Sequence, residues 1–559
     1  MGYPFGSVLI YNYENNDGMM LIDGLQRFST IIDYEKHPEN YIATDEFVEK
    51  LFDILSTRFS STQKGNMKFE KSIRKQLLIY VKETLSSTDL KSSFLYKQIS
   101  NDELLKPFWD TSMIEDVIEL QDEIEFTKKN FLKVDQILIP TIQFLGEVTE
   151  LAKVFENINK GGKKLTKYQV FAAQWYNNSI QLNDKKYNQI ILEEVISRYQ
   201  ALDQNREIQI ENFSADQMRE EKVINLSELC FALGKLIIKD SPVFYSEKNS
   251  EDLADELGYS TMGIIFGVDN KRLHTLQNYI NTINNADFIE ELFDAVKTIF
   301  VNINDHFEKY LRLPMQKKQY ENKKISNFKF LSYFADLWSN NFKITPEGRV
   351  SNDSTGANTK YAKTLSNFIY YYIFDSIQNI WGNAGDSRLN LYYLDKKNYV
   401  IRPTKQEFLD GLTLWWNDRV SNGSLIFDDI SKLLLVVNTN LKSNGLQVGR
   451  NFDYEHIIVR NKVKDIYQSL QIPAGTLGNM MFLDSNINRS KKDMNIYNLN
   501  SVGGQNIPNE FIQLNHYPSE SVIAGIERDL ENSNGESAIE FIKNRGLTII
   551  KELVDSLYD

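Results

Sequence analysis

The chain has 559 residues, which is more than one compact core holds, and its 42% hydrophobic and 25% charged residues are ordinary for a globular protein of two to four domains. Its net charge of −13 excludes a general nucleic-acid coat, although a local basic track can still bind DNA. A single cysteine, Cys230, excludes intrachain disulfides and cysteine-cluster metal sites. We therefore expect a cytoplasmic protein without a signal peptide and without a membrane-spanning run.

The opening of the chain has the pattern strand, turn, strand, helix. "GSVLIYNY" and "MMLI" have the aliphatic and aromatic content of strands, and the turn-like "ENNDG" separates them. Helical patterns follow from about 45 to 135, "QILIPTIQFL" predicts a short strand, and nearly everything from about 150 to 345 is helical. From 450 the pattern changes to a strand-like "FDYEHIIV", a glycine-bounded "LGNMMFL" and a terminal helix.

The stretch "LIDGLQRFST" (21–30) places an Asp-Gly corner between the second strand and the first helix. If the helix begins after Gly24, Gln26 and Arg27 lie on its polar side, at the N-terminus. Unpaired N–H groups and the helix dipole favour an anion there, Arg27 can grip a phosphate, and Asp23 can hold Mg²⁺ or orient a water. The alternative is an ordinary strand-to-helix turn whose aspartate caps the helix.

A second corner, "VFENINKGGKKLTKYQVFAAQW" (154–175), joins two predicted helices through a Gly-Gly loop that contains Asn159 and Gly162. A solvated basic loop is the alternative reading of this segment alone. "DGLQR" resembles the DGQQR signature of the ParB-like N-terminal domain of the GmrSD family, and "FENINKGGKKLTKYQV" resembles a later motif of that domain. Family members are type IV, modification-dependent restriction enzymes and related phage-defence proteins.

The resemblance implies that this domain binds and hydrolyses a nucleoside triphosphate (GTP, UTP, CTP or ATP) with Mg²⁺. The implied nucleotide-binding residues are Asp23, which is also a catalytic candidate, Gly24, Gln26, Arg27, Asn159 and Gly162. The chain departs from the family in two places: Leu25 replaces the first glutamine of the signature, and the segment that precedes "GYPFGSVLIY" in the family is expected to be missing.

A carboxylate stands directly before a histidine in "FDYEHIIV". Strand alternation places Asp453 and Glu455 on one face and Tyr454 and His456 on the other. An imidazole can take a proton from water near neutral pH, and a neighbouring carboxylate can hold Mg²⁺ or Mn²⁺, so the pair suits metal-assisted hydrolysis. The alternative is a structural histidine in a strand.

Downstream, "TLGNMMFLDSNINRSKKD" (476–493) supplies an asparagine before a second strand and another at a helix. This order resembles the ββα-metal, or HNH, nuclease domain of the same family. The resemblance implies His456 as general base, Glu455 and Asn488 as metal ligands with Asp453 sharing in metal binding, and Asn479 as a residue that orients the histidine or braces the loop. Asn486 competes with Asn488 for the ligand role.

Basic side chains flank this segment and could face the phosphates of DNA, or could simply be solvated. They are Arg460, Lys462, Lys464, Arg489, Lys491 and Lys492, of which the last three are the predicted DNA contacts. A further basic run, "RLPMQKKQYENKK" (312–324), is either a DNA-facing helix end or plain surface.

These patterns predict an α+β, multi-domain chain: a small ParB-like α/β domain over 1–175, a helical region over 176–385, and an HNH domain over 386–559 with its core at 450–500. We expect a phage-defence, modification-dependent DNA endonuclease with an NTP-dependent sensor domain. The alternatives are a nucleotide-gated DNA-binding module with an inactive nuclease, and an HNH nuclease without nucleotide dependence. Expected partners are DNA, including modified phage DNA, a nucleotide and, as an open alternative, a second copy in a homodimer.

Overall fold

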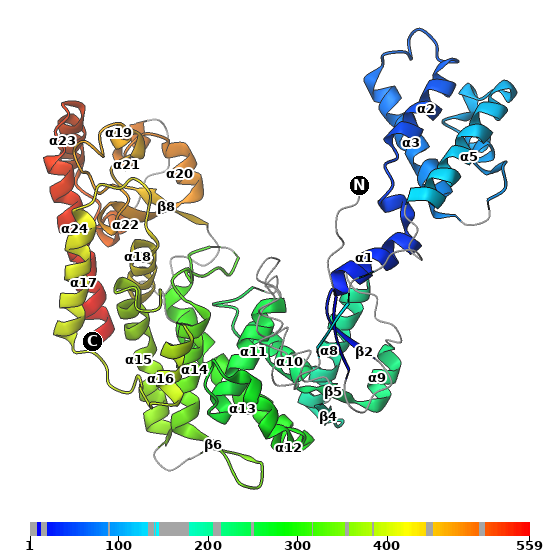
Figure 1. Cartoon of the computed structure of the whole chain (residues 1–559). Coiled ribbons are helices and arrows are strands. Elements are labelled where there is room, and N and C mark those ends of the chain that lie inside the picture. Colours follow the sequence, from blue (N-terminus) through cyan, green and yellow to red (C-terminus); the bar gives the residue numbers. More distant parts are fainter. Residues whose placement is uncertain are drawn as a thin grey trace. The chain divides into compact units, whose positions relative to one another are not determined.

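The computed structural model describes residues 8–12, 19–87, 90–131, 139, 141–144, 178–204, 214–246, 251–315, 317–352, 357–382, 385–442, 451–501 and 509–559. Its internal contacts divide the chain into two compact units, Met1–Lys164 with Ile196–Ala215 and Leu165–Val195 with Asp216–Asp559. Long helices dominate the described parts, and the sheets are few and small, which is the α+β layout that the sequence predicts (Figure 1).

The first unit opens with a three-stranded sheet in the order β2–β1–β3. β1 (Val8–Asn12) pairs antiparallel with β2 (Met19–Asp23) and parallel with β3 (Thr141–Phe144). The three predicted strands are therefore confirmed. The helices between β2 and β3 serve as the long crossover that a parallel pairing requires.

The first helix, α1 (Leu25–Lys36), begins directly after a glycine in the left-handed conformation, as predicted. Gly24 has a φ of 105° and a ψ of 6°. A Cβ built on this residue would lie 2.5 Å from Cγ1 of Val8, which is itself buried in β1. Backbone geometry and the lack of space both require glycine at this corner.

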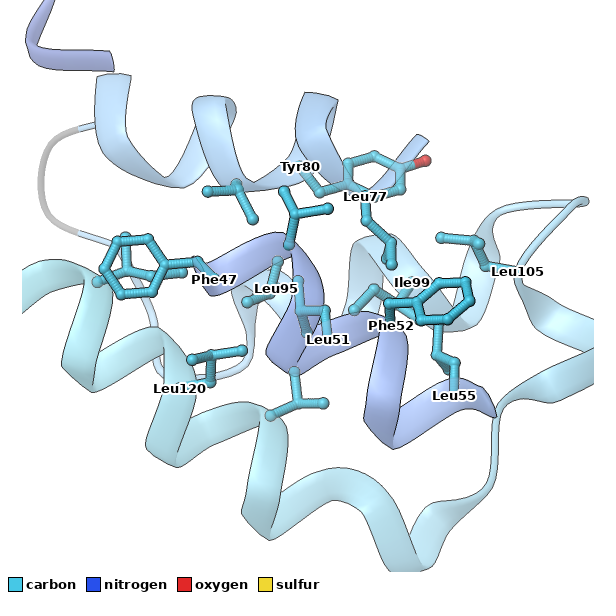
Figure 2. Close-up of a cluster of buried hydrophobic side chains, with 14 of the residues drawn as sticks. Phe47, Leu51, Phe52, Leu55, Leu77, Tyr80, Leu95, Ile99, Leu105 and Leu120 are labelled. Atoms are coloured by element: carbon cyan, nitrogen blue, oxygen red, sulfur yellow. The ribbon is translucent and has the colours of Figure 1, made fainter. Parts of the chain in front are cut away.

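In the part of the first unit that the structure describes, four helices and three short 3₁₀ turns enclose an apolar core. They are η1 (Pro38–Asn40), α2 (Asp45–Ser56), α3 (Met67–Ser86), α4 (Phe94–Asn101), η2 (Lys106–Phe108), η3 (Thr111–Met113) and α5 (Ile114–Phe131). Figure 2 shows how Leu51, Leu77, Leu95 and Leu120 come from four different helices and converge on one another. Full burial of one such leucine contributes about 1.5–3 kcal/mol, so this cluster holds the helices together.

The second unit contains most of the described helices, and its described residues form three small antiparallel sheets. The sheets pair β4 (Ser179–Gln181) with β5 (Val223–Asn225), β6 (Phe342–Ile344) with β7 (Val350–Asn352), and β8 (Phe452–His456) with β9 (Met480–Asp484). The described helices between residues 186 and 442 are α8 (Lys186–Gln204), whose residues from Ile196 onward are grouped with the first unit, α9 (Ala215–Glu221), α10 (Leu226–Asp240), α11 (Glu251–Phe266), η7 (Leu273–Tyr279), α12 (Ile280–Ile283), α13 (Ala286–Leu311), α14 (Asn327–Asn341), α15 (Ala357–Ile377), α16 (Asp386–Tyr393), α17 (Lys405–Val420) and α18 (Asp429–Lys442).

A close crossing of α10 and α11 forms part of the interior of the second unit. A Cβ on Gly258 would lie 1.7 Å from the carbonyl oxygen of Cys230, so these backbones approach as only glycine allows. Burial raises the pKa of the Cys230 thiol well above its usual value. The lone cysteine is therefore a packing residue and not a reactive thiolate.

One aromatic core runs through the predicted boundary at residue 385. Tyr399, which follows α16, lies 5.3 Å from Tyr333 of α14 and 5.6 Å from Phe368 of α15, measured between ring centroids. Helices on both sides of residue 385 thus share an interior and belong to one compact unit. The contacts therefore group the chain differently from the predicted division into 1–175, 176–385 and 386–559. No helix within the described ranges is both long and apolar enough to cross a membrane.

The last part of the second unit surrounds β8 and β9. Its remaining elements are α19 (Arg460–Val463), η8 (Leu477–Asn479), α20 (Ser485–Lys491), α21 (Ile496–Ser501), α22 (Asn509–Leu514), α23 (Glu520–Glu531) and α24 (Glu536–Tyr558). The C-terminal helix α24 packs against α17, α18 and η8, and Figure 1 shows α17 beside α24. A Cβ on Gly478 would lie 1.9 Å from the carbonyl oxygen of Ile542, so the turn before β9 lies directly on α24.

Candidate active site

The candidate site is built on the antiparallel pair β8–β9 and the short helix α20 that follows it. His456 pairs with Met480, and Asp453 pairs with Leu483. The four apolar residues that open β9 are buried, which fixes this strand in the interior. Asp484 ends β9, and its side chain accepts a 2.9 Å hydrogen bond from the backbone N–H of Asn486, so the chain turns from strand to helix at this residue.

The two carboxylates of β8 both face α20, as strand alternation predicts. Asp453 accepts hydrogen bonds from the hydroxyl of Ser485 (2.9 Å) and from the side-chain amide of Asn488 (3.2 Å). Glu455 accepts a 2.5 Å hydrogen bond from the ammonium of Lys491. Because Asn488 donates through its NH₂ group to Asp453, its side-chain oxygen remains available as a ligand for a cation.

His456, at the end of β8, lies on the other face of the strand. Its ring stacks on Phe427, with centroids 3.9 Å apart, and its Nε2 lies 3.2 Å from the carbonyl oxygen of Leu425. A carbonyl oxygen can only accept, so in this contact the neutral ring carries its proton on Nε2 and has a free lone pair on Nδ1.

The electrostatic surroundings keep this imidazole uncharged. Burial lowers the pKa of His456 to about 4, the hydrogen bond to Leu425 opposes this shift, and the charges of Lys491 and Arg460 lower the pKa further. At neutral pH the ring is therefore in the form that accepts a proton.

A cavity of about 660 Å³ opens beside the end of β8 and gathers the chemically active groups. His456, Glu455 and Asn488 all line it, so the structure brings together the predicted base and two of the predicted metal ligands. Exposed Arg460 and Lys492 line the same cavity and supply positive charge. The cavity can hold an anionic group next to a neutral base and two oxygen donors.

Asp453 was also predicted as a metal ligand, but it lies elsewhere. It lines a separate pocket on the other side of α20, together with Arg489. Its two oxygens are engaged by Ser485 and Asn488. Asp453 is therefore placed to orient Asn488 and not to reach the cavity beside His456.

The donor set of the cavity suits a hard cation. Glu455 and Asn488 offer carboxylate and amide oxygens, which Mg²⁺ and Mn²⁺ prefer, and Mg²⁺ needs few protein ligands because it keeps several waters. Glu455 also carries the buried ammonium of Lys491, so a divalent cation would share this carboxylate with the lysine. Across the ranges that the structure describes, no group of three or more His, Cys, Asp or Glu side chains is arranged to hold a metal ion.

Lys491 was predicted to contact DNA, and its placement differs from that prediction. Its side chain is fully buried, and its ammonium lies on Glu455 and 3.5 Å from the carbonyl oxygen of His456. A cation enclosed in this way cannot touch a phosphate from outside. The other two predicted DNA contacts, Arg489 and Lys492, are exposed.

Asn479 braces the loop that follows β8 and does not touch the histidine ring in any described contact. Its side-chain oxygen accepts a 2.7 Å hydrogen bond from the N–H of Ile458, and its NH₂ donates to the carbonyl oxygens of Ile458 (3.2 Å) and Ala474 (2.9 Å). Asn479 is wholly buried and is absent from the lining of the cavity beside His456. Of its two predicted roles, this geometry matches the brace.

One supporting residue was missed in the sequence. Arg545 of α24 is buried and donates from Nη1 to the carbonyl oxygens of Leu477 (3.1 Å) and Gly478 (3.0 Å), which hold the turn before β9. Burial lowers its pKa to about 9, so it remains charged at neutral pH. An arginine within the apolar stripe of Ile542 and Ile549 is the signal that could have revealed it.

The predicted nucleotide site lies mostly outside the described residues. Asn159 and Gly162 belong to undescribed segments, and at Asp23, Gln26 and Arg27 only the backbone is described. What the structure does contribute is the strand–glycine–helix corner itself, with α1 starting immediately after Gly24.

Comparison with known proteins identifies the first third of the chain. Residues 1–176 match the family model described as "GmrSD restriction endonuclease, N-terminal domain". No curated protein and no solved structure matches the chain. The resemblance to the GmrSD family is thus confirmed over residues 1–176, and this match points to a restriction endonuclease.

Proposed function

We propose that this protein is a Mg²⁺-dependent DNA endonuclease with an HNH-type site, acting in phage defence. The observation that carries the proposal is the cavity in which a neutral His456 meets the oxygens of Glu455 and Asn488, on a strand–strand–helix frame. The GmrSD-type N-terminal domain supports DNA as the substrate class.

In this proposal His456 is the general base. With the proton held on Nε2 by the carbonyl of Leu425, Nδ1 takes a proton from a water that attacks the scissile phosphorus, and the bond from this phosphorus to the leaving oxygen breaks. Stacking on Phe427 fixes the plane of the ring and thus the direction of that lone pair.

Arg460 and Lys492 hold the substrate. Both are exposed and line the cavity, so each can donate to the non-bridging oxygens of a phosphodiester. Their charge offsets the acidity of the whole chain where the scissile phosphate must approach.

Glu455 and Asn488 are the proposed metal ligands. A bound divalent cation would supply charge stabilisation for the scissile phosphate and the leaving oxygen. Asp453 fixes the amide of Asn488, and Lys491 fixes the carboxylate of Glu455, so both ligands are pre-oriented by hydrogen bonds from behind.

A second candidate function is a DNA-binding module without nuclease activity. The ion pair between Lys491 and Glu455 favours it, because the ammonium already satisfies the carboxylate that a metal would need. The two functions differ in whether DNA is cut in the presence of Mg²⁺.

The N-terminal domain is proposed to bind and hydrolyse a nucleoside triphosphate, to sense modified DNA, and to gate the nuclease. The match to the GmrSD N-terminal domain and the glycine corner before α1 support a phosphate site there. Asp23, Gly24, Gln26 and Arg27 are its proposed contacts, with Asn159 and Gly162 from the second motif. A nuclease that ignores nucleotides is the alternative.

The test is cleavage of supercoiled plasmid and of phage DNA with Mg²⁺, with EDTA as the control. Modified and unmodified DNA are compared, without nucleotide and with each of GTP, UTP, CTP and ATP. Mg²⁺-dependent nicking or cutting supports the nuclease, and its absence on every substrate supports the binding module. If the cleavage rate does not depend on nucleotides and equilibrium dialysis detects no nucleotide binding, the N-terminal domain does not gate the nuclease through a nucleotide.

A further inference from the structure

A second pocket lies on the far side of α20 from His456. It has a volume of about 320 Å³, and its lining includes Lys317, Gln319, Asp453, Ser485 and Arg489. Ser485 and Arg489 are four residues apart on α20 and therefore share one face of the helix, whereas Asn488 faces the cavity beside His456. The helix α20 thus separates two polar pockets.

The other wall of this second pocket comes from the basic run at 312–324. Arg312 and Tyr320 form an isolated β-bridge, and the N–H of Leu313 donates to the carbonyl oxygen of Gln319 (2.8 Å), so the chain doubles back on itself here. The run begins at Arg312, the C-cap of α13, so its start lies at a helix end as one of the two predictions had it, and its other described residues form a loop.

This loop is fixed to the first strand of the candidate site. The N–H of Phe452 donates to the carbonyl oxygen of Pro314 (3.2 Å), and the hydroxyl of Tyr454 donates to the carboxylate of Glu321 (3.0 Å). The side chain of Asn440 in α18 also donates to the carbonyl oxygen of Arg312 (2.9 Å). The loop therefore keeps a defined position relative to β8.

The charges on this pocket favour an anion. Lys318 is paired with Glu308, and Lys323 and Lys324 each lie 3.9 Å from Asp429. By contrast, Lys317 and Arg489 are exposed, and no ion pair among the described residues involves either of them.

The only carboxylate among the described lining residues is Asp453. Its two oxygens accept from Ser485 and Asn488. Two cations without acidic partners thus face a pocket whose single carboxylate is already hydrogen-bonded, and such a pocket suits a phosphate group.

We propose that this second pocket binds a phosphodiester of the DNA backbone other than the scissile one, with Lys317 and Arg489 as its two contacts. The inference rests on the proposed function, and it makes the loop 312–324 part of the DNA track. The duplex lies across α20, with one phosphate between Arg460 and Lys492 and another between Lys317 and Arg489. The hydrogen bond from Asn488 to Asp453 links the two pockets.

The test measures DNA affinity against salt concentration in the full-length chain carrying His456→Ala, so that bound DNA stays intact. Fluorescence anisotropy with a labelled duplex compares this protein with the same protein carrying Lys317→Ala and Arg489→Ala. Each lost phosphate contact lowers the magnitude of the slope of log K against log[salt] by about 0.9, so the expected loss for two contacts is about 1.8. At 0.1 M salt each contact is worth roughly eight-fold in affinity on the same relation.

A matched control replaces two exposed lysines elsewhere in the second unit, Lys363→Ala and Lys551→Ala, which remove the same net charge. The control is expected to keep the slope of the His456→Ala protein. If the Lys317 and Arg489 variant keeps it as well, the second pocket is not a phosphate site. Far-UV circular dichroism of each variant shows whether its fold is intact.

Cleavage by the protein with His456 in place separates this inference from the proposed function. If that protein cuts DNA and the salt slope is unchanged in the Lys317 and Arg489 variant, the inference fails and the nuclease stands. If the slope falls by the expected amount but no DNA is cut under any condition, the DNA track stands and the nuclease proposal fails. If both hold, Lys317→Ala and Arg489→Ala are expected to raise KM with little change in kcat, because they remove binding that is uniform along the reaction.

Discussion

Replacing Asn479 by alanine tests whether this residue is a structural brace or a catalytic residue. The structure predicts the size of the resulting loss of stability. The side chain makes three hydrogen bonds to backbone groups of Ile458 and Ala474, and it has no exposed surface. A hydrogen bond contributes about 1 kcal/mol net, and a buried group left without its partner costs about 1–3 kcal/mol. Asn479→Ala is therefore expected to lower the free energy of unfolding by about 3–5 kcal/mol.

The assay is urea unfolding followed by tryptophan fluorescence. Trp416 of α17 is a suitable reporter, because it is fully buried and packs against Gly546 of α24, the helix that supports η8. The midpoint should fall at an unchanged m value. Asn486→Ala is the matched control, since this exposed asparagine should change stability by less than about 0.5 kcal/mol. Wild-type stability together with lost DNA cleavage in Asn479→Ala would refute the brace and make Asn479 catalytic.

Three further predictions concern the corner, the buried lysine and a buried histidine. Gly24→Ala should lower the melting temperature of the first unit, because its φ of 105° and the 2.5 Å approach to Val8 exclude a Cβ; an unchanged melting temperature in calorimetry would contradict this. Lys491→Met should destabilise the protein by about 3 kcal/mol by leaving Glu455 unpaired, and Mn²⁺ should restore more stability to this variant than to wild type. If Mn²⁺ raised the melting temperature of the two proteins equally, Glu455 would not be a ligand of the metal. Burial lowers the pKa of His306 to about 3. The unfolded chain therefore binds a proton at this residue between about pH 6.5 and 3 while the folded chain does not, so this residue alone lowers stability by about 1.4 kcal/mol per pH unit below 6.5. His306→Phe should flatten this acid-side loss in urea midpoints measured at pH 7 and pH 5, and an equal loss in both proteins would contradict the assignment.

Local patterns predicted much of the secondary structure. The strands of the first sheet, the start of α1 after Gly24 and the strand that ends at His456 follow from residue types that act over a few positions. The parallel pairing of β3 with β1 does not, because it depends on how the five intervening helices α1 to α5 pack. The shared core around Tyr399 was equally hidden, since its aromatic partners are far apart in sequence.

The candidate site was predictable in its residue types but not in its contacts. Strand alternation placed Asp453 and Glu455 together, yet it could not show that α20 takes Asp453 away from the cavity and leaves Glu455 in it. In the sequence, Lys491 has the pattern of a surface charge because it stands in a polar, basic run with Arg489 and Lys492. Those two residues are exposed in the structure, but Lys491 is buried. Its burial results from a packing contact between α20 and β8 that no local pattern encodes.

The central claim is that His456 is the base of a DNA-cleaving site. It is tested most directly by the single-turnover rate at which the protein cleaves a DNA duplex in the presence of Mg²⁺. Wild type is compared with His456→Ala and with His274→Ala, which alters an exposed histidine far along the chain in η7. DNA affinity is measured in parallel. The proposed role predicts that His456→Ala loses about 10²–10⁴-fold in rate at unchanged affinity while His274→Ala cuts like wild type. Equal cleavage rates for wild type and His456→Ala would contradict it.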